Sequence, residues 1–225
     1  MERAGIISQS SEKSLFLKKV YAHLFFAICG FVGLEYIWFS GPVAYEVLQI
    51  VSQFNWMWIL GAFMIVSWLA TRLADNSNKK STQYIGLILY TVFESLIFIP
   101  LLAVAQMKSG AEIIGTAGYL TIFCFLALTA IVFFTKVDLA GWGKYLMWGG
   151  IVAIGAIACG AIFGFNLGVG FSAIMVCFAG AAILYDTSMI LHYSNKDAYV
   201  GASLRLFASV AMLFWYVLSI LNSRD

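Results

Sequence analysis

Residues 113–134 read IIGTAGYLTIFCFLALTAIVFF and contain no charged side chain. A helix needs about 20 apolar residues to cross the hydrocarbon core of a bilayer, so this stretch is long enough to span a membrane. It is too long for a strand of a membrane barrel, and its polar and apolar residues do not alternate. Because lipid offers no hydrogen-bond partner to the backbone, we expect the stretch to be an α-helix.

Comparable apolar stretches occupy most of the chain. Of its 225 residues 62% are hydrophobic and 11% are charged, and the mean hydropathy is +0.92. This composition is not that of a soluble globular protein. We therefore expect an all-α integral membrane protein with seven transmembrane helices, at residues 20–39, 56–74, 84–105, 113–134, 145–163, 169–191 and 199–221.

The seven spans leave little sequence for anything else. We expect residues 1–19 to form a polar cytoplasmic tail, residues 20–221 a single transmembrane domain, and residues 222–225 a short carboxy-terminal tail. The polar residues 1–14 do not resemble a cleavable signal peptide. A net charge of +2 argues against nucleic acid as a partner, and the short loops exclude a sizeable soluble catalytic domain.

The cations outside the spans predict the orientation. If the amino terminus is cytoplasmic, nine lie on the cytoplasmic side and two, Lys108 and Arg224, lie outside. Cytoplasmic loops of membrane proteins are enriched in Lys and Arg, which favours this orientation over the reverse. The nine cations are Arg3, Lys13, Lys18, Lys19, Lys79, Lys80, Lys136, Lys144 and Lys196.

Five charged residues lie within the expected spans: Glu35, Arg72, Glu94, Asp186 and Arg205. A charge at the centre of a membrane helix costs about 2.5–3.5 kcal/mol on insertion scales, so each needs a partner, water or a function. Asp186, Arg205 and Arg72 fall in one layer, roughly 3–9 Å inside the cytoplasmic boundary. We therefore expect an ion pair between Asp186 and either Arg72 or Arg205.

The two remaining acids differ in depth. Glu94 lies near the middle of its span with no cation at the same depth, so it is either protonated or reached by a water-filled cavity. Glu35 lies near the outer boundary beside Tyr36 and Trp38, where we expect it to be solvated.

Several functions of membrane proteins are disfavoured by the residues present. No lysine lies deep enough in a span to hold retinal, and Ser172 and His192 lie on one helix about 30 Å apart, too far for a protease dyad. The two histidines are on different spans, and no cysteine has metal-ligand spacing. We expect no enzymatic activity and no resident metal or cofactor. The cysteines are Cys29, Cys124, Cys159 and Cys177.

Small residues recur every four positions in the fifth and sixth spans, which a tight hairpin joins. Such stripes permit close approach of helix backbones, so we expect these two spans to pack together. The residues are Ala156, Gly160 and Gly164 in the fifth span and Ala173, Cys177 and Ala181 in the sixth.

Two motifs near the carboxy terminus resemble a known family. Residues 181–192, AAILYDTSMILH, are similar to the sixth-helix signature of the Bax inhibitor-1 family, with small residues, an aromatic, an acid and Thr before an Ile-rich turn. Residues 202–225 are similar to the bacterial YccA-like branch of that family. The resemblance implies a bundle of seven helices in which the carboxy-terminal helix is central and the other six surround it.

The resemblance also implies a candidate site. In calcium-leak members, aspartates on helices six and seven share a proton and gate a pore, and an arginine of helix two partners the helix-six acid. Asp186 matches the helix-six aspartate and Arg72 is the candidate for the arginine. Ser209 stands where the helix-seven aspartate would be, so the two-aspartate sensor is incomplete, and Arg205 lies one turn earlier.

Two functions follow from the resemblance. The first is a pH-sensitive cation leak, with calcium as the transported ion, in which Asp186, Arg72, Arg205, Ser209 and Glu94 form the ion path or the pH sensor. The second is a regulatory partner of a membrane-anchored AAA protease, to which residues 1–18 would be presented. Either function places the protein in the bacterial inner membrane, with the lipid bilayer around it.

Overall fold

The computed structural model describes residues 2–54, 56–75, 79–165, 167–193 and 197–223, with the side chains of residues 2–11 and 56 left aside. The described chain is helical and contains no strand. Its elements are α1 (Glu2–Ser40), α2 (Val43–Gln53), α3 (Trp56–Ala74), α4 (Lys80–Ser109), α5 (Ala111–Thr135), the short 3₁₀ helix η1 (Ala140–Trp142), α6 (Gly143–Phe163), α7 (Gly168–His192) and α8 (Tyr199–Leu221).

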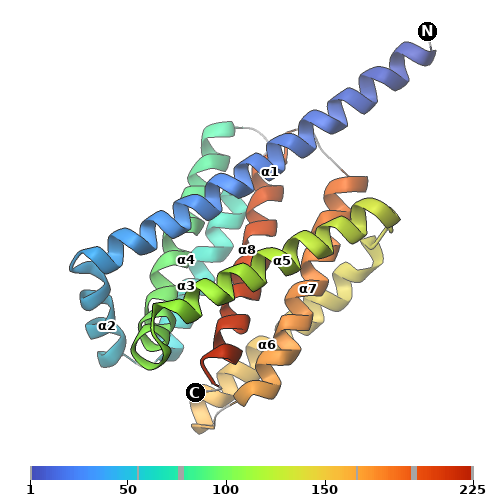
Figure 1. Ribbon diagram of the computed structural model, residues 1–225. Coiled ribbons are helices and arrows are strands. Elements are labelled where there is room, and N and C mark those ends of the chain that lie inside the picture. The colour runs from blue at the N-terminus through green and yellow to red at the C-terminus, as the bar shows by residue number, and fades with distance from the viewer. Residues whose placement is uncertain (1, 55, 76–78, 166, 194–196, 224–225) are drawn as a thin grey trace.

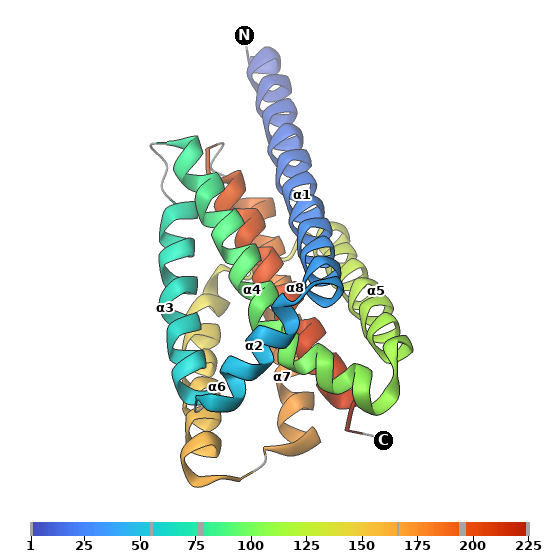
Figure 2. The same ribbon diagram turned by 90° about the vertical axis from the view of Figure 1, so that its left-hand side faces the viewer.

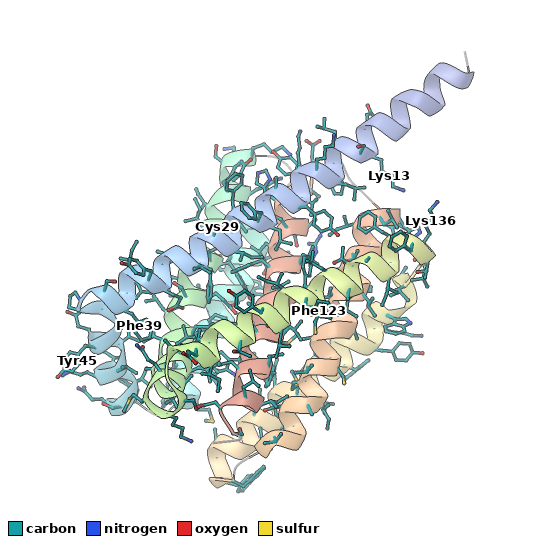
Figure 3. The ribbon with its side chains drawn as sticks, in the orientation of Figure 1. Lys13, Cys29, Phe39, Tyr45, Phe123 and Lys136 are labelled. Carbon is teal, nitrogen blue, oxygen red and sulfur yellow. The ribbon has the colours of Figure 1, made fainter. Side chains whose placement is uncertain are left out.

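The predicted fold class is confirmed. Seven of the described helices, α1 and α3 to α8, are long and apolar enough to cross a membrane, and they match the seven predicted spans. The protein is therefore an all-α, multi-pass membrane protein. The two termini lie at opposite ends of the bundle (Figure 1). Lys13 and Lys136 lie at the same end as the amino terminus (Figure 3), and we call this the lysine-rich end.

Helix α1 differs from the prediction at its amino-terminal end. We expected a polar tail over residues 1–19, but α1 begins at Glu2 and continues without a break into the first span. The sequence of this segment contains no proline, so nothing in it interrupts the helix. As a result the first helix projects beyond the other helices at the lysine-rich end (Figure 1).

Helix α2 was not predicted, because its 11 residues are too few for a span. It begins directly after Gly41 and Pro42, the two residues that separate it from the end of α1. Ala44 is buried where α2 packs against α1 and α4, whereas Tyr45 is exposed. Figure 3 shows helix α2 at the end of the bundle opposite the lysine-rich end, with Tyr45 at its outer surface.

Helix α8 is the centre of the bundle. It packs against α1, α3, α4, α5 and α7, and twelve of its residues are buried (Figures 1 and 2). The central position of the carboxy-terminal helix agrees with the prediction. Helix α6 instead lies at the edge of the bundle, where it packs on α7 and α3 (Figure 2).

Glycines allow α3 to approach its neighbours closely. A Cβ atom at Gly86 of α4 would lie 2.5 Å from the carbonyl oxygen of Ala70 and from the backbone nitrogen of Ala74. A Cβ atom at Gly201 of α8 would strike Oδ1 of Asp75 and would lie 3.0 Å from the carbonyl oxygen of Ala74. The end of α3 is thus wedged against both α4 and α8, which brings Asp75 beside α8.

Helices α6 and α7 are neighbours, as predicted, but the small-residue stripes do not form all of their contact. Ala173 and Cys177 are exposed. The close approach that the structure shows is that of the Phe178 ring to Gly149, where a Cβ atom would lie 2.7 Å from Cε2 of that ring. An aromatic ring seated on a glycine therefore takes the place of a small-on-small contact.

Candidate functional site

Asp186 of α7 and Ser209 of α8 are joined directly. The Ser209 hydroxyl donates a hydrogen bond of 2.7 Å to Oδ2 of Asp186. Ser209 is buried and Asp186 is half-buried. The residue type at position 209 fits the geometry, because a hydroxyl can donate to a carboxylate across this short distance.

The predicted ion pair of Asp186 with Arg205 is not formed. Nη1 of Arg205 lies 2.5 Å from Oδ1 of Asp75, the residue that follows α3. Helical side chains lean toward the amino terminus of their helix, and α8 begins at the lysine-rich end. The guanidinium group therefore reaches away from the level of Ser209 and toward Asp75.

The predicted pair of Asp186 with Arg72 is also wrong. Arg72 is exposed, and its guanidinium carbon lies 5.4 Å from the centroid of the Trp68 ring. Ala70 and Ala74 on the same helix are fully buried. Because Arg72 is two residues from each of them, about 200° around the helix, it points away from the bundle.

Two cavities lie on either side of the Asp186–Ser209 hydrogen bond. The small cavity, of about 340 Å³, is lined by residues of α1, α7 and α8, including Asp186, Tyr193 and Arg205. The large cavity, of about 830 Å³, lies among α3, α4, α6, α7 and α8 and is lined by Ser209 and Glu94. Asp186 lines the small cavity and Ser209 the large one, so their hydrogen bond stands between the two.

Glu94 lies in the wall of the large cavity. It is 6% exposed, and its Oε2 atom has no hydrogen-bond partner in the described structure. The sequence left open whether this acid is protonated or reached by a cavity. The structure places it at a cavity, which it shares with Ser209.

Glu35 is not solvated as predicted. It is 9% exposed, and neither carboxylate oxygen has a hydrogen-bond partner in the described structure. Glu35 lies four residues after Phe31, whose ring packs against Phe98 of α4 at a centroid distance of 5.1 Å. Residues four apart share a helix face, so Glu35 faces α4 rather than water.

Ser188, two residues beyond Asp186 on α7, makes contacts that no sequence pattern indicated. The Ser188 hydroxyl accepts a 2.9 Å hydrogen bond from the backbone nitrogen of Leu139 and donates another of 2.9 Å to the carbonyl oxygen of Val137. A polar residue in a span usually marks a function, but Ser188 is here a structural anchor for the loop between α5 and α6.

Asp138 in that loop makes a second connection to α7. Its Oδ1 accepts from the Ala140 backbone nitrogen at 3.0 Å, and its Oδ2 accepts from the Tyr193 hydroxyl at 2.7 Å. Both hydrogen bonds favour the ionised carboxylate, so they lower the pKa of Asp138, and the bond to Asp138 raises the pKa of Tyr193. Tyr193 also lines the small cavity.

Comparison with known proteins gives the family. The sequence model of the family described as "Inhibitor of apoptosis-promoting Bax1" matches residues 13–225. Bax inhibitor 1 of Schizosaccharomyces pombe is 30% identical over 220 residues, which are 94% of this chain and 77% of that protein. The protein named Modulator of FtsH protease YccA, of Escherichia coli, is 31% identical over 156 residues, 68% of this chain and 71% of that protein. An uncharacterized protein of Pseudomonas aeruginosa is 28% identical over 189 residues, 81% of each chain.

The match and the fold agree with the resemblance seen in the motifs around Asp186 and at the carboxy terminus. The matched region contains all seven membrane helices apart from the first residues of α1. The chain belongs to the Bax inhibitor-1 family.

Proposed function

We propose that the protein is a pH-sensitive cation leak, with calcium as the principal ion, and that the Asp186–Ser209 hydrogen bond is its closed gate. The observation that carries this proposal is the position of that bond between the large and small cavities. Separating α7 from α8 at this point would join the two cavities. Glu94 in one cavity and Asp186 in the other supply carboxylates that attract cations.

The Asp75–Arg205 pair supports a path for cations. A free guanidinium group beside Asp186 would repel an approaching cation, but Asp75 balances the charge of Arg205. The pair also connects the second span to the last one, with the base on α8 and the acid directly after α3. Asp186 then keeps a neutral hydroxyl as its partner.

The orientation follows from the charges. Lys13 and Lys136 lie at the same end of the bundle (Figure 3), and a cytoplasmic location for this end satisfies the preference of Lys and Arg for that side. The small cavity then faces the cytoplasm and the large cavity faces the outer half of the membrane. A relative is named inner membrane protein YccA, which favours the bacterial inner membrane as the location.

Protonation of Asp186 supplies the pH sensitivity. A hydrogen bond from a hydroxyl to a carboxylate is roughly twice as strong as one between neutral groups. A proton on Asp186 therefore weakens the connection between α7 and α8 and favours the open gate.

Calcium flux into liposomes that contain the pure protein, measured between about pH 6 and 8, tests this proposal. Asp186→Asn removes the titrating group, so its flux should lose the pH dependence of the wild type. Ser209→Asp places two carboxylates side by side, which cannot both be ionised at close range, so its flux should depend more steeply on pH. Glu46→Gln, an exposed position on α2, is the matched control. The absence of flux in the wild type at every pH, or a folded Ser209→Asp protein with the wild-type pH profile, would contradict the gate.

A second candidate function is the modulation of a membrane-anchored AAA protease. Two observations favour it: one relative is named a modulator of FtsH protease, and α1 projects from the bundle at the lysine-rich end (Figure 1). A projecting helix is a surface that a partner can bind. Reconstitution of the protease with the full chain, or with a chain lacking residues 2–11, tests this function. Substrate degradation should change with the full chain and return to its basal rate with the shortened one.

A further inference from the structure

The large cavity has the size and the lining of a site for a small organic molecule. Its volume of about 830 Å³ falls within the range of ligand-binding pockets, roughly 300–1,000 Å³. Most of the residues that line it are apolar or aromatic, among them Phe63 of α3, Ile157 of α6, and Met212 of α8. Such walls favour an occupant with an apolar body.

Glu94 gives this cavity one specific polar feature. The residue is more than nine-tenths buried, and its Oε2 atom is buried without a hydrogen-bond partner in the described structure. A buried polar atom without a partner is unfavourable, so a ligand that donates a hydrogen bond to it would stabilise the folded protein. No lysine, arginine or histidine is among the residues lining the cavity.

The serine hydroxyls of the cavity already have acceptors. The hydroxyl of Ser209 donates to Asp186, that of Ser219 donates to the carbonyl oxygen of Trp215, and that of Ser172 donates to the carbonyl oxygen of Gly168. Glu94 is the acidic residue in the lining, and its Oε2 atom can accept a hydrogen bond from a ligand. A cationic donor fits an acidic acceptor better than a neutral one.

Aromatic rings in the wall add to the preference for a cation. Tyr90 lies one turn before Glu94 on α4, and its ring is 6.5 Å from that of Phe63 between centroids. Phe171 and Tyr216 form a second pair, with centroids 6.0 Å apart. All four line the cavity. The faces of aromatic rings attract organic cations, because the ring face carries partial negative charge.

The rim of the cavity gives access from the bilayer. Leu60 and Phe63 of α3 face Ile154 and Ile157 of α6 in its lining, and the side chain of Ile154 is 45% exposed. Helices α3 and α6 are neighbours at one edge of the bundle (Figure 2). A molecule dissolved in the lipid can therefore reach the cavity without crossing water.

We propose that the large cavity binds a lipophilic amine, with its ammonium group on the carboxylate of Glu94 and its apolar body between α6, α7 and α8. This site does not depend on whether the protein conducts ions. The amine would lie beside the Asp186–Ser209 hydrogen bond, because Ser209 lines the large cavity whereas Asp186 does not.

Binding of 1-adamantylamine tests the proposal, with 1-adamantanol as a probe that has the same apolar cage and no positive charge. The measurement is the thermal unfolding midpoint of the pure protein in lipid nanodiscs, as a function of the concentration of each probe, because a ligand that binds the folded state raises the midpoint. We expect the amine to bind the wild type about tenfold more tightly than it binds Glu94→Gln, since Gln has the same shape without the charge. The alcohol should bind both proteins equally.

A second variant keeps the test decisive if Glu94→Gln does not fold. Ala153 of α6 is buried in the cavity wall, and Ala153→Leu fills part of the space while Glu94 remains. We expect this variant to lose the midpoint shift with both probes. Effects of the probes on the lipid itself are common to all three proteins, so an equal shift by the amine in the wild type, Glu94→Gln and Ala153→Leu would overturn the proposal.

Discussion

At the scale of the residue, the Ser209 hydroxyl is the group that ties α8 to Asp186. We expect Ser209→Ala to lower the free energy of unfolding by about 1–3 kcal/mol, because it leaves a partly buried carboxylate without its donor. Ser203 on the same helix is also buried, but its hydroxyl donates within the helix to the carbonyl oxygen of Val200. Ser203→Ala is therefore the matched control and should cost less. Unfolding by denaturant in micelles measures both, and equal costs would show that the interhelical bond does not stabilise the fold.

The partner of Arg205 shows why ion pairs were harder to predict from the sequence than the depth of each charge. Hydropathy placed Arg205 and Asp186 in one layer, because depth depends only on the position along a span, and both residues line the small cavity. Ion pairing also depends on the rotation of each helix and on the direction in which a long side chain extends. Asp75 was overlooked because it lies just beyond the end of its span, although α3 is held against α8 at that point by Gly201. The cavities could not be predicted from the pattern of any one helix, because they arise from the packing of several helices.

The corrected pairing gives a prediction for the two arginines. A double-mutant cycle between Asp75→Asn and Arg205→Ala should yield a coupling energy of about 0.2–1 kcal/mol, because both side chains are nearly half exposed. The same cycle between Asp75→Asn and Arg72→Ala should yield none, since Arg72 stacks on Trp68 outside the bundle. Coupling of Arg72 to Asp186 in a further cycle would contradict the exposed position of Arg72 over the Trp68 ring.

At the scale of the element, the contact of α3 with α4 depends on Gly86. Gly86→Ala should destabilise the protein by about 1–3 kcal/mol, because the new methyl group meets rigid backbone atoms of Ala70 and Ala74. Gly61→Ala on α3 is the control, since a Cβ atom there has no neighbour within 4 Å. That variant should leave the stability unchanged or raise it slightly, as alanine is the better helix former. Thermal unfolding of the two variants side by side measures the difference.

The end of α7 offers a prediction for pH. Hydrogen bonds from Ala140 and Tyr193 lower the pKa of Asp138, so their contribution to stability is present above the ordinary pKa of aspartate and is lost as the pH falls through the lowered value. Tyr193→Phe removes one of the two donors, and we expect the pKa of Asp138 to rise toward its ordinary value. Carboxyl carbon chemical shifts of Asp138, followed from about pH 2 to 6, measure the change. An identical titration in both proteins would mean that the Tyr193 bond does not form in solution.

The elements themselves were predictable to different degrees. The seven spans were found because lipid forces each crossing to be an apolar helix of a certain length, and this requirement acts on each stretch alone. Helix α2 and the amino-terminal part of α1 carry no such requirement, since both contain enough polar residues to lie outside the hydrocarbon region. Their helical structure depends on local preference and on packing, which hydropathy does not measure.

At the scale of the whole molecule, the odd number of spans sets the two ends of the chain on opposite sides of the membrane. The lysine-rich end should be cytoplasmic, because cations near the ends of spans are retained there. We therefore expect a membrane-impermeant maleimide, added to intact spheroplasts, to label a cysteine placed at Ser223 and to leave one placed at Lys13 unlabelled. Both substituted positions are exposed, and the four native cysteines lie within the membrane helices and are replaced first.

A second pair of positions checks the same orientation independently of the chain termini. A cysteine at Lys136, after α5, should behave like the one at Lys13, and a cysteine at Glu112, at the start of α5, should behave like the one at Ser223. Permeabilised cells, in which all four positions should react, control for accessibility. Labelling of Lys13 and Ser223 from the same side would contradict the odd number of crossings. Labelling of Lys13 and Lys136 alone from outside would reverse the orientation and place the small cavity, with Asp186, on the outer side.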